Sequence, residues 1–311
     1  MNVIETFGLT KRFGALTAVH DLSIAIPQGS VFGFLGPNGA GKTTTVRMLS
    51  ALIAPTSGTA TVAGHALGQD DKAIRKNVGI LTETPGLYGK MSALQNLVFF
   101  ARLYEVDEPR ARSQAEKYLA MLDLADRAND RVAGFSKGMR QKVAIARALI
   151  HEPPVVFLDE PTAGLDPEAS RTVRDFIKEM RQEGRTIFIT THNLPEADEL
   201  CDLIGVFRTT LLRVDTPANL RRSLFGTGTL VKLAGDPALW TGVAAGLPFV
   251  KDVQVHDGAL AVRLEDPDER NPLLVQALVN AGAPIRYIIP MDYSLEEVYL
   301  ELMDENKVAV A

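Results

Sequence analysis

Residues 36–43 have the residue types and the spacing of a loop that wraps around phosphate. They read GPNGAGKT, follow an apolar run at residues 31–35 and precede a helical pattern that starts at Lys42. Glycines let the backbone curl so that successive N–H groups face one anion, and the N-terminus of the following helix adds positive potential. The segment fits G-x-x-x-x-G-K-[ST] at every fixed position, which favours a nucleotide-phosphate site over a glycine turn without a ligand. The residues expected at this site are Gly36, Asn38, Gly39, Ala40, Gly41, Lys42, Thr43 and Thr44.

Two acids follow a second apolar run. Residues 154–158 read PVVFL, and Asp159 and Glu160 come directly after them. Ligands of open α/β sheets bind at the carboxyl ends of the strands, so these acids are expected beside the phosphates. Asp159, together with the Thr43 hydroxyl, is expected to hold Mg²⁺, while Lys42 reaches the β- and γ-phosphates and Glu160 polarises the attacking water. Without the glycine loop, an acid pair at a strand end would indicate no more than the start of a loop.

Apolar runs alternate with helical patterns around both motifs. This alternation predicts an α/β fold with a parallel sheet. Between residues 92 and 150 the pattern is helical and charged instead, which indicates a helical insertion at about residues 91–150. The expected strands lie at residues 3–7, 16–26, 30–35, 59–62, 78–81, 154–158 and 186–190, and the expected helices at 42–52 and 168–183.

A weaker pattern of Pro, Gly, Arg and Ser at residues 216–229 suits a boundary between domains. We therefore expect a first domain at residues 1–222 and a second at residues 223–311. The second domain has the element order βαββαβ, which is the ferredoxin-like pattern. Its expected strands lie at residues 230–234, 250–255, 260–264 and 285–289, and its expected helices begin at Pro237 and span 271–281.

Composition narrows the classes of function. The 311 residues are 46% hydrophobic, which suits a globular protein of two domains. A formal charge of -5 and an isoelectric point near 5.6 argue against a nucleic-acid partner. The single cysteine, Cys201, excludes an intramolecular disulfide. No apolar stretch approaches the roughly 18 to 20 residues of a spanning helix, so no such helix is expected.

Residues 135–141 read FSKGMRQ and precede a helical pattern. Ser136 lies where an N-cap would be, and the segment lies just upstream of the Asp159 strand. In this context the chain resembles the ATP-binding subunits of ABC transporters over about residues 3–220. Residues 135–139 occupy the place of the family's LSGGQ signature, keep Ser136 and Gly138 and have Met139 at its fifth position. The FSKGMRQ form resembles export-type subunits of the ABC-2 class, such as those for drug and antibiotic resistance.

The resemblance implies roles for further residues. Phe13 is similar to the aromatic residue that stacks on adenine, Asp166 ends a segment like the D-loop, and His192 is similar to the switch histidine that contacts the γ-phosphate. Glu83 stands where most of the family has the Q-loop glutamine. A carboxylate can still approach Mg²⁺, but it adds a charge and lacks an amide donor. Two alternatives therefore stay open: Glu83 contacts the metal, or it does not.

The resemblance also implies a P-loop NTPase of the ABC ATPase type, with a helical signature subdomain and a small C-terminal α+β domain. It implies hydrolysis of ATP with Mg²⁺ by a homodimer that sandwiches two nucleotides. In that dimer Ser136 and Gly138 serve the nucleotide of the other copy, and Met139 and Asp166 are further residues expected to contact nucleotide. A separate polytopic membrane permease would complete an exporter, placing this chain in the cytoplasm on the inner face of the cell membrane. The alternatives are a soluble ABC ATPase that assembles or remodels proteins, and an importer, which the export-like signature disfavours.

Overall fold

The computed structural model describes residues 1–308 except 83, 85 and 292, and only the backbone of Phe225 and residues 304–308. The chain divides into two compact units, Met1–Pro217 and Ala218–Ala311. The division falls at the start of α8 (Pro217–Phe225), and the boundary expected at residue 222 lies inside this helix.

A six-stranded sheet forms the centre of the first unit, in the order β11-β10-β4-β9-β8-β7. Neighbouring strands from β10 to β7 pair in parallel, and β11 pairs antiparallel with β10. Every residue of β4, β8 and β9 is buried, which is typical of a parallel sheet covered on both faces. The strands are β4 (Val31–Leu35), β7 (Val78–Leu81), β8 (Val155–Asp159), β9 (Thr186–Thr191), β10 (Leu203–Arg208) and β11 (Thr210–Asp215).

Phenylalanines from four neighbouring strands fill one part of this core. The Phe34 ring centroid lies 4.5 Å from that of Phe207 and 5.4 Å from that of Phe188, and Phe157 is 5.5 Å from Phe188. All four side chains are fully buried. Three of these strands, β4, β8 and β9, carry the sequence motifs at their carboxyl ends, so the aromatic contacts help to hold those ends together.

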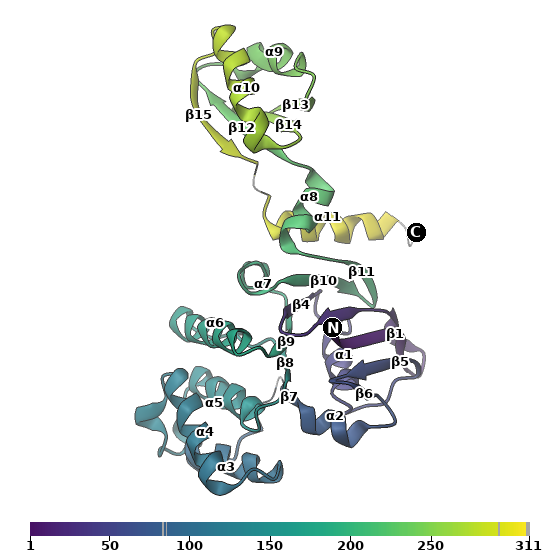
Figure 1. Ribbon diagram of the computed structural model, residues 1–311, viewed down its shortest axis with the longest axis vertical. Coiled ribbons are helices and arrows are strands. Elements are labelled where there is room, and N and C mark those ends of the chain that lie inside the picture. The colour runs from purple at the N-terminus through teal and green to yellow at the C-terminus, as the bar shows by residue number, and fades with distance from the viewer. Residues whose placement is uncertain (83, 85, 292, 309–311) are drawn as a thin grey trace. The chain divides into compact units, whose positions relative to one another are not determined.

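An antiparallel sheet of the first unit packs against the same core. Figure 1 shows it on the side of the parallel sheet opposite the helices α3 to α6. It pairs in the order β2-β1-β5-β6, with β3 also paired to β1. Its strands are β1 (Asn2–Phe13), β2 (Leu16–Leu22), β3 (Ala25–Pro27), β5 (Ser57–Val62) and β6 (His65–Ala66).

Polar residues define where three of the helices begin. Ser92 and Gln95 form a capping box at α3, Ser136 caps α5 by accepting from the Met139 N–H, and Asp166 caps α6 by accepting from the Ala169 N–H. Helices α3, α4 and α5 pack together and form the helical insertion. The helices are α1 (Lys42–Leu49), α2 (Asp71–Asn77), α3 (Ala93–Leu103), α4 (Glu108–Met121), α5 (Lys137–Leu149), α6 (Pro167–Gln182) and α7 (Leu194–Leu200).

The second unit is built on an antiparallel sheet in the order β13-β14-β12-β15. With βαββαβ connectivity this is the ferredoxin-like topology, as expected. Its elements are β12 (Gly228–Leu233), η3 (Pro237–Trp240), α9 (Thr241–Ala245), β13 (Val250–His256), β14 (Ala259–Leu264), α10 (Pro267–Asn280), β15 (Ile285–Pro290) and the terminal α11 (Leu295–Val308). The predicted fold class, α/β with a small C-terminal α+β domain, is therefore confirmed.

Some expected boundaries are wrong. The strand expected at residues 16–26 is two strands, β2 and β3, which pair with different parts of β1. Helix α10 begins at Pro267 rather than Asn271. Proline favours the first turn of a helix. Pro267 supplies that turn in α10, so the helix begins before the expected start, and Pro272 lies inside it.

Within the described part of the chain, no helix combines the length and the apolar character that crossing a bilayer requires.

A partly buried histidine joins the helical insertion to the parallel sheet. The His151 ring stacks on Tyr104 with centroids 3.7 Å apart, and its Nε2 lies 3.2 Å from the Val78 carbonyl oxygen. Burial lowers the pKa of His151 from its ordinary 6.5 to about 4.

As the pH falls, His151 therefore takes up a proton at a higher pH in the unfolded state than in the folded state. The free energy of unfolding should fall by at most about 3 kcal/mol as the pH falls from about 6.5 to about 4. We expect His151→Phe, which keeps a ring on Tyr104, to remove this part of the pH dependence in urea unfolding. The exposed His20 supplies the control, His20→Gln. An unchanged pH dependence in His151→Phe would assign it to other groups.

Candidate nucleotide site

The glycine loop leaves β4 and enters α1 with its backbone against two neighbours. A Cβ atom on Gly36 would lie 2.2 Å from the Phe207 carbonyl oxygen, and one on Gly41 would lie 2.1 Å from that of Ala18. Gly41 also has a φ of +105°, and no side chain caps the N–H groups of α1. Only glycine fits both positions, and the uncapped N–H groups stay available to an anion.

A turn ties this loop to the β2 strand. The Thr209 N–H donates to the Ala40 carbonyl at 3.0 Å, and the His20 N–H donates to the Thr209 carbonyl at 2.7 Å. The glycine loop and the hairpin of β1 and β2 are therefore joined through one residue of a third segment.

Lys42 bends back over the glycine loop. Its Nζ donates to the carbonyl oxygens of Gly36 at 2.6 Å and Pro37 at 3.2 Å, and lies 3.8 Å from Glu160 Oε1. Burial lowers the pKa of Lys42, and the charges of Glu160 and Asp159 partly offset that shift. A buried ammonium held largely by neutral carbonyls is suited to bind an additional anion.

Asp159 is held by two threonine hydroxyls. Thr43 Oγ1 donates to Asp159 Oδ2 at 2.8 Å, and the Thr190 hydroxyl donates to Asp159 Oδ1. Asp159 as a whole is 5% exposed. Hydroxyl and carboxylate oxygens are the donors that Mg²⁺ prefers, so Thr43 and Asp159 fit this ion. Among the described residues there is no cluster of three or more His, Cys, Asp or Glu.

Glu160 and His192 meet at the ends of β8 and β9. The Glu160 Oε2 atom lies 2.8 Å from His192 Nδ1, and the Glu160 N–H donates to the Thr190 carbonyl at 2.9 Å. Glu160 has a φ of +51°, in the left-handed region that favours glycine. A non-glycine residue keeps this backbone only when its surroundings fix it, and such strain gathers at functional sites.

The predicted residues from three strand ends line one cleft of about 520 Å³. At one end Phe13 is 50% exposed, and Lys11 Nζ lies 5.1 Å from its ring centroid. An exposed ring at the rim offers a face for stacking a planar base. The predicted residues along the cleft are Phe13, Asn38, Gly39, Ala40, Gly41, Lys42, Thr43, Thr44, Asp159, Glu160 and His192; Gly36 adjoins the loop at the end of β4.

The structure does not bring the other predicted residues into this cleft. Ser136 and Asp166 cap α5 and α6, and a Cβ atom on Gly138 would lie 3.4 Å from the Ala169 Cβ. Ser136, Gly138, Met139 and Asp166 are absent from the residues that line the cleft of their own chain. The predicted metal contact of Glu83 lies outside the described residues and stays a prediction.

The sequence analysis missed several residues of the cleft. Leu16, Ala18 and Ala163 line it, and Thr190 holds Asp159. The signal for Leu16 was the short hairpin, because Phe13 pairs directly with it. The signal for Thr190 was a hydroxyl at the end of a buried apolar run.

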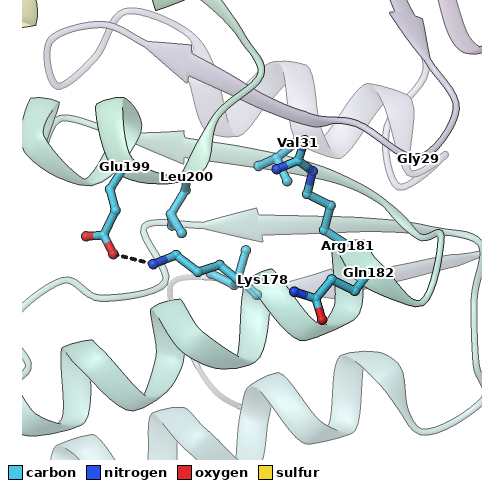
Figure 2. A pocket seen from close by; sticks show the side chains of 8 residues that line it. Gly29, Val31, Lys178, Arg181, Gln182, Glu199 and Leu200 are labelled. Carbon is cyan, nitrogen blue, oxygen red and sulfur yellow. Dashed lines mark hydrogen bonds and ion pairs between the residues drawn. The ribbon is translucent and has the colours of Figure 1, made fainter.

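Figure 2 shows a second pocket, of about 310 Å³, beside α6 and α7. Its lining charges already have partners, since Lys178 Nζ lies 2.5 Å from Glu199 Oε1 and Arg181 pairs with Asp202. None of the predicted site residues lines it. The first cleft is therefore the candidate nucleotide site.

Comparisons with known proteins agree with this geometry. A family model described as ABC transporter matches residues 19–163. The daunorubicin resistance ATP-binding protein DrrA3 of Streptomyces coeruleorubidus is 35% identical over 306 residues, which cover 98% of this chain and 96% of that protein. The linearmycin resistance ATP-binding protein LnrL of Bacillus subtilis (strain 168) is 30% identical over 98% of this chain and 97% of its own. The solved dimeric structure of MJ0796, a bacterial ABC transporter cassette, superposes with a TM-score of 0.63 at 25% identity over 68% of this chain and 98% of that one.

Proposed function

This chain belongs to the ABC transporter family as an ATP-binding ATPase, and from that premise we propose that it drives export of a substrate through a separate membrane permease. The observation that carries the proposal is the meeting of Lys42, Asp159, Glu160 and His192 in one cleft, in a chain similar over nearly its full length to resistance proteins.

In this proposal the cleft binds ATP from its base to its γ-phosphate. The N–H groups of Gly39 to Thr43 face the phosphates, with Gly36, Asn38 and Thr44 completing the loop. Lys42 exchanges its carbonyl contacts for the β- and γ-phosphates, and the half-exposed Phe13 stacks on adenine.

Thr43 and Asp159 are the residues that would hold Mg²⁺. When bound, this ion neutralises charge on the phosphate oxygens. The Thr190 hydroxyl orients Asp159, so the carboxylate presents a defined oxygen toward Thr43.

Hydrolysis requires a base for water at the γ-phosphate. Glu160 lies between Lys42 and His192, and its left-handed backbone fixes its direction. In our proposal Glu160 accepts the proton from water, while His192 orients Glu160 and contacts the γ-phosphate.

A second copy of this chain completes each site. The α5 N-terminus at Ser136, Gly138 and Met139, and Asp166 at α6, would contact the nucleotide held by the partner. The dimeric cassette among the solved structures supports this arrangement. ATP binding then joins two subunits and hydrolysis releases them, which moves rigid bodies.

The partner in the membrane is a polytopic permease, and the place of action is the cytoplasmic face of the cell membrane. Both relatives are named for resistance to a compound, which suits removal of that compound from a cell. These names do not favour an assembly ATPase without transport, or an importer.

Copurification tests this proposal. The tagged chain is isolated from gently solubilised membranes of its source, with an untagged preparation as the control. We expect a multi-span membrane protein at a near-equal amount. Soluble partners alone, together with robust ATPase activity and no membrane association, would instead support the assembly ATPase.

A further inference from the structure

Glu196 is a buried carboxylate outside the nucleotide cleft. It lies in the first turn of α7, four positions after His192, and is 2% exposed. An ionised group is rarely buried to this extent without partners, because burial removes its hydration. Burial raises the pKa of Glu196, and hydrogen bonds from two threonines oppose that shift.

Both oxygens of Glu196 accept a hydrogen bond, one from the loop after β8 and one from the last residue of β9. Thr162 Oγ1 donates to Oε1 at 2.7 Å, and Thr191 Oγ1 donates to Oε2 at 2.9 Å. Thr162 follows Glu160 by two positions, and Thr191 directly precedes His192. One carboxylate therefore joins the loop after β8 to the carboxyl end of β9.

These contacts differ from those of a glutamate that only caps its own helix. In a capping box the glutamate at the third helical position accepts from the backbone N–H of the N-cap residue. Here the N-cap is Asn193, whose N–H donates to Thr191 Oγ1 at 2.9 Å instead. Asn193 accepts from the Glu196 N–H, so α7 is capped without the Glu196 side chain.

The contacts form a closed path around the Glu160 and His192 pair. Glu160 contacts His192 at 2.8 Å, His192 follows Thr191 in the chain, Thr191 bonds to Glu196, and Glu196 bonds to Thr162. The Ala163 N–H donates back to the Glu160 carbonyl at 3.2 Å. Glu160 has an unfavourable φ of +51°, so the conformation depends on contacts of this kind.

We infer that Glu196 is a positioning residue that sets the geometry of Glu160 relative to His192 by joining Thr162 to Thr191. This inference rests on the proposed roles of Glu160 and His192. Glu196 acts through the two loops and does not touch the nucleotide cleft.

Steady-state ATPase kinetics of the full chain test the inference with variants on both ends of the contact. Glu196→Gln keeps the shape but loses the charge. Thr162→Val loses the hydroxyl at constant shape, and Thr162→Ser restores it. A displaced catalytic group lowers turnover more than nucleotide binding, so we expect about tenfold lower kcat in Glu196→Gln and Thr162→Val, with KM for ATP within about twofold of the wild type. Thr162→Ser should keep wild-type kcat.

The double variant Glu196→Gln with Thr162→Val should be no slower than Glu196→Gln alone, because both changes act on the same contact. Wild-type kcat in both single variants, or equal losses in Thr162→Ser and Thr162→Val, would overturn the inference. So would a change in KM without a change in kcat. A Glu160→Gln chain measured in parallel distinguishes failure of this inference from failure of the proposed function. Full turnover in that chain would contradict the proposed roles of Glu160 and His192 as well.

Discussion

Replacing Glu160 by Gln should lower ATP turnover about 10²- to 10⁴-fold and leave ATP binding within a few-fold of the wild type. The amide keeps the shape of the side chain but cannot accept a proton from water. The loss corresponds to roughly 3 to 5 kcal/mol of activation free energy. Turnover is measured as phosphate release, and binding by equilibrium titration with ATP.

The matched control for this prediction is Glu179→Gln. Glu179 is exposed on α6 and does not line the cleft, so its substitution should leave turnover unchanged. A Glu160→Gln chain that keeps more than about a tenth of wild-type turnover would remove Glu160 from the role of general base.

The second large effect tests the proposal that two chains share each nucleotide site. Lys42→Ala removes the cation of the phosphate loop, and Gly138→Asp places a negative charge at the start of α5. Aspartate suits the first turn of a helix, so α5 should fold, while its charge repels a partner's phosphates. Each variant alone should lose at least about 10²-fold in ATPase activity.

Mixing these two variants should restore activity. A mixed dimer pairs the intact phosphate loop of the Gly138→Asp chain with the intact α5 of the Lys42→Ala chain. About a quarter of wild-type activity is expected if subunits exchange freely and sites act independently.

A mixture of Lys42→Ala and Glu160→Gln provides the control for that experiment. Both of those changes affect the same half of the site, so no mixed dimer has an intact site. Equal activity in the two mixtures would contradict a nucleotide shared between chains.

The sequence was sufficient to predict the centre of the first unit. A glycine loop between an apolar strand and a helix restricts the backbone between them. Lys42 begins that helix, and Asp159 and Glu160 lie at the expected strand end. Helix boundaries depend on which of several competing residues forms the first turn, and in α10 that residue is Pro267 rather than the expected Asn271.

The contacts between loops could not be predicted in the same way. Thr162 and Glu196 are 34 positions apart, and they meet because β8 and β9 are neighbours in register. Neither residue belongs to a short motif. In a polar first turn of a helix, the sequence does not distinguish a buried glutamate from an exposed one. The order of the strands in the sheet could likewise not be predicted from the sequence. The contact between Glu160 and His192 depends on that order.

The Thr209 turn has a consequence for how strongly the cleft holds its nucleotide. This turn joins the phosphate loop to the hairpin that carries Phe13. The phosphate loop and the Phe13 ring are therefore two binding elements held at a fixed separation. Once the phosphates are held, the base meets the Phe13 ring at a high effective concentration. If adenine stacks on the half-exposed Phe13 as proposed, that stack, weak as a separate contact, multiplies the affinity for the whole nucleotide.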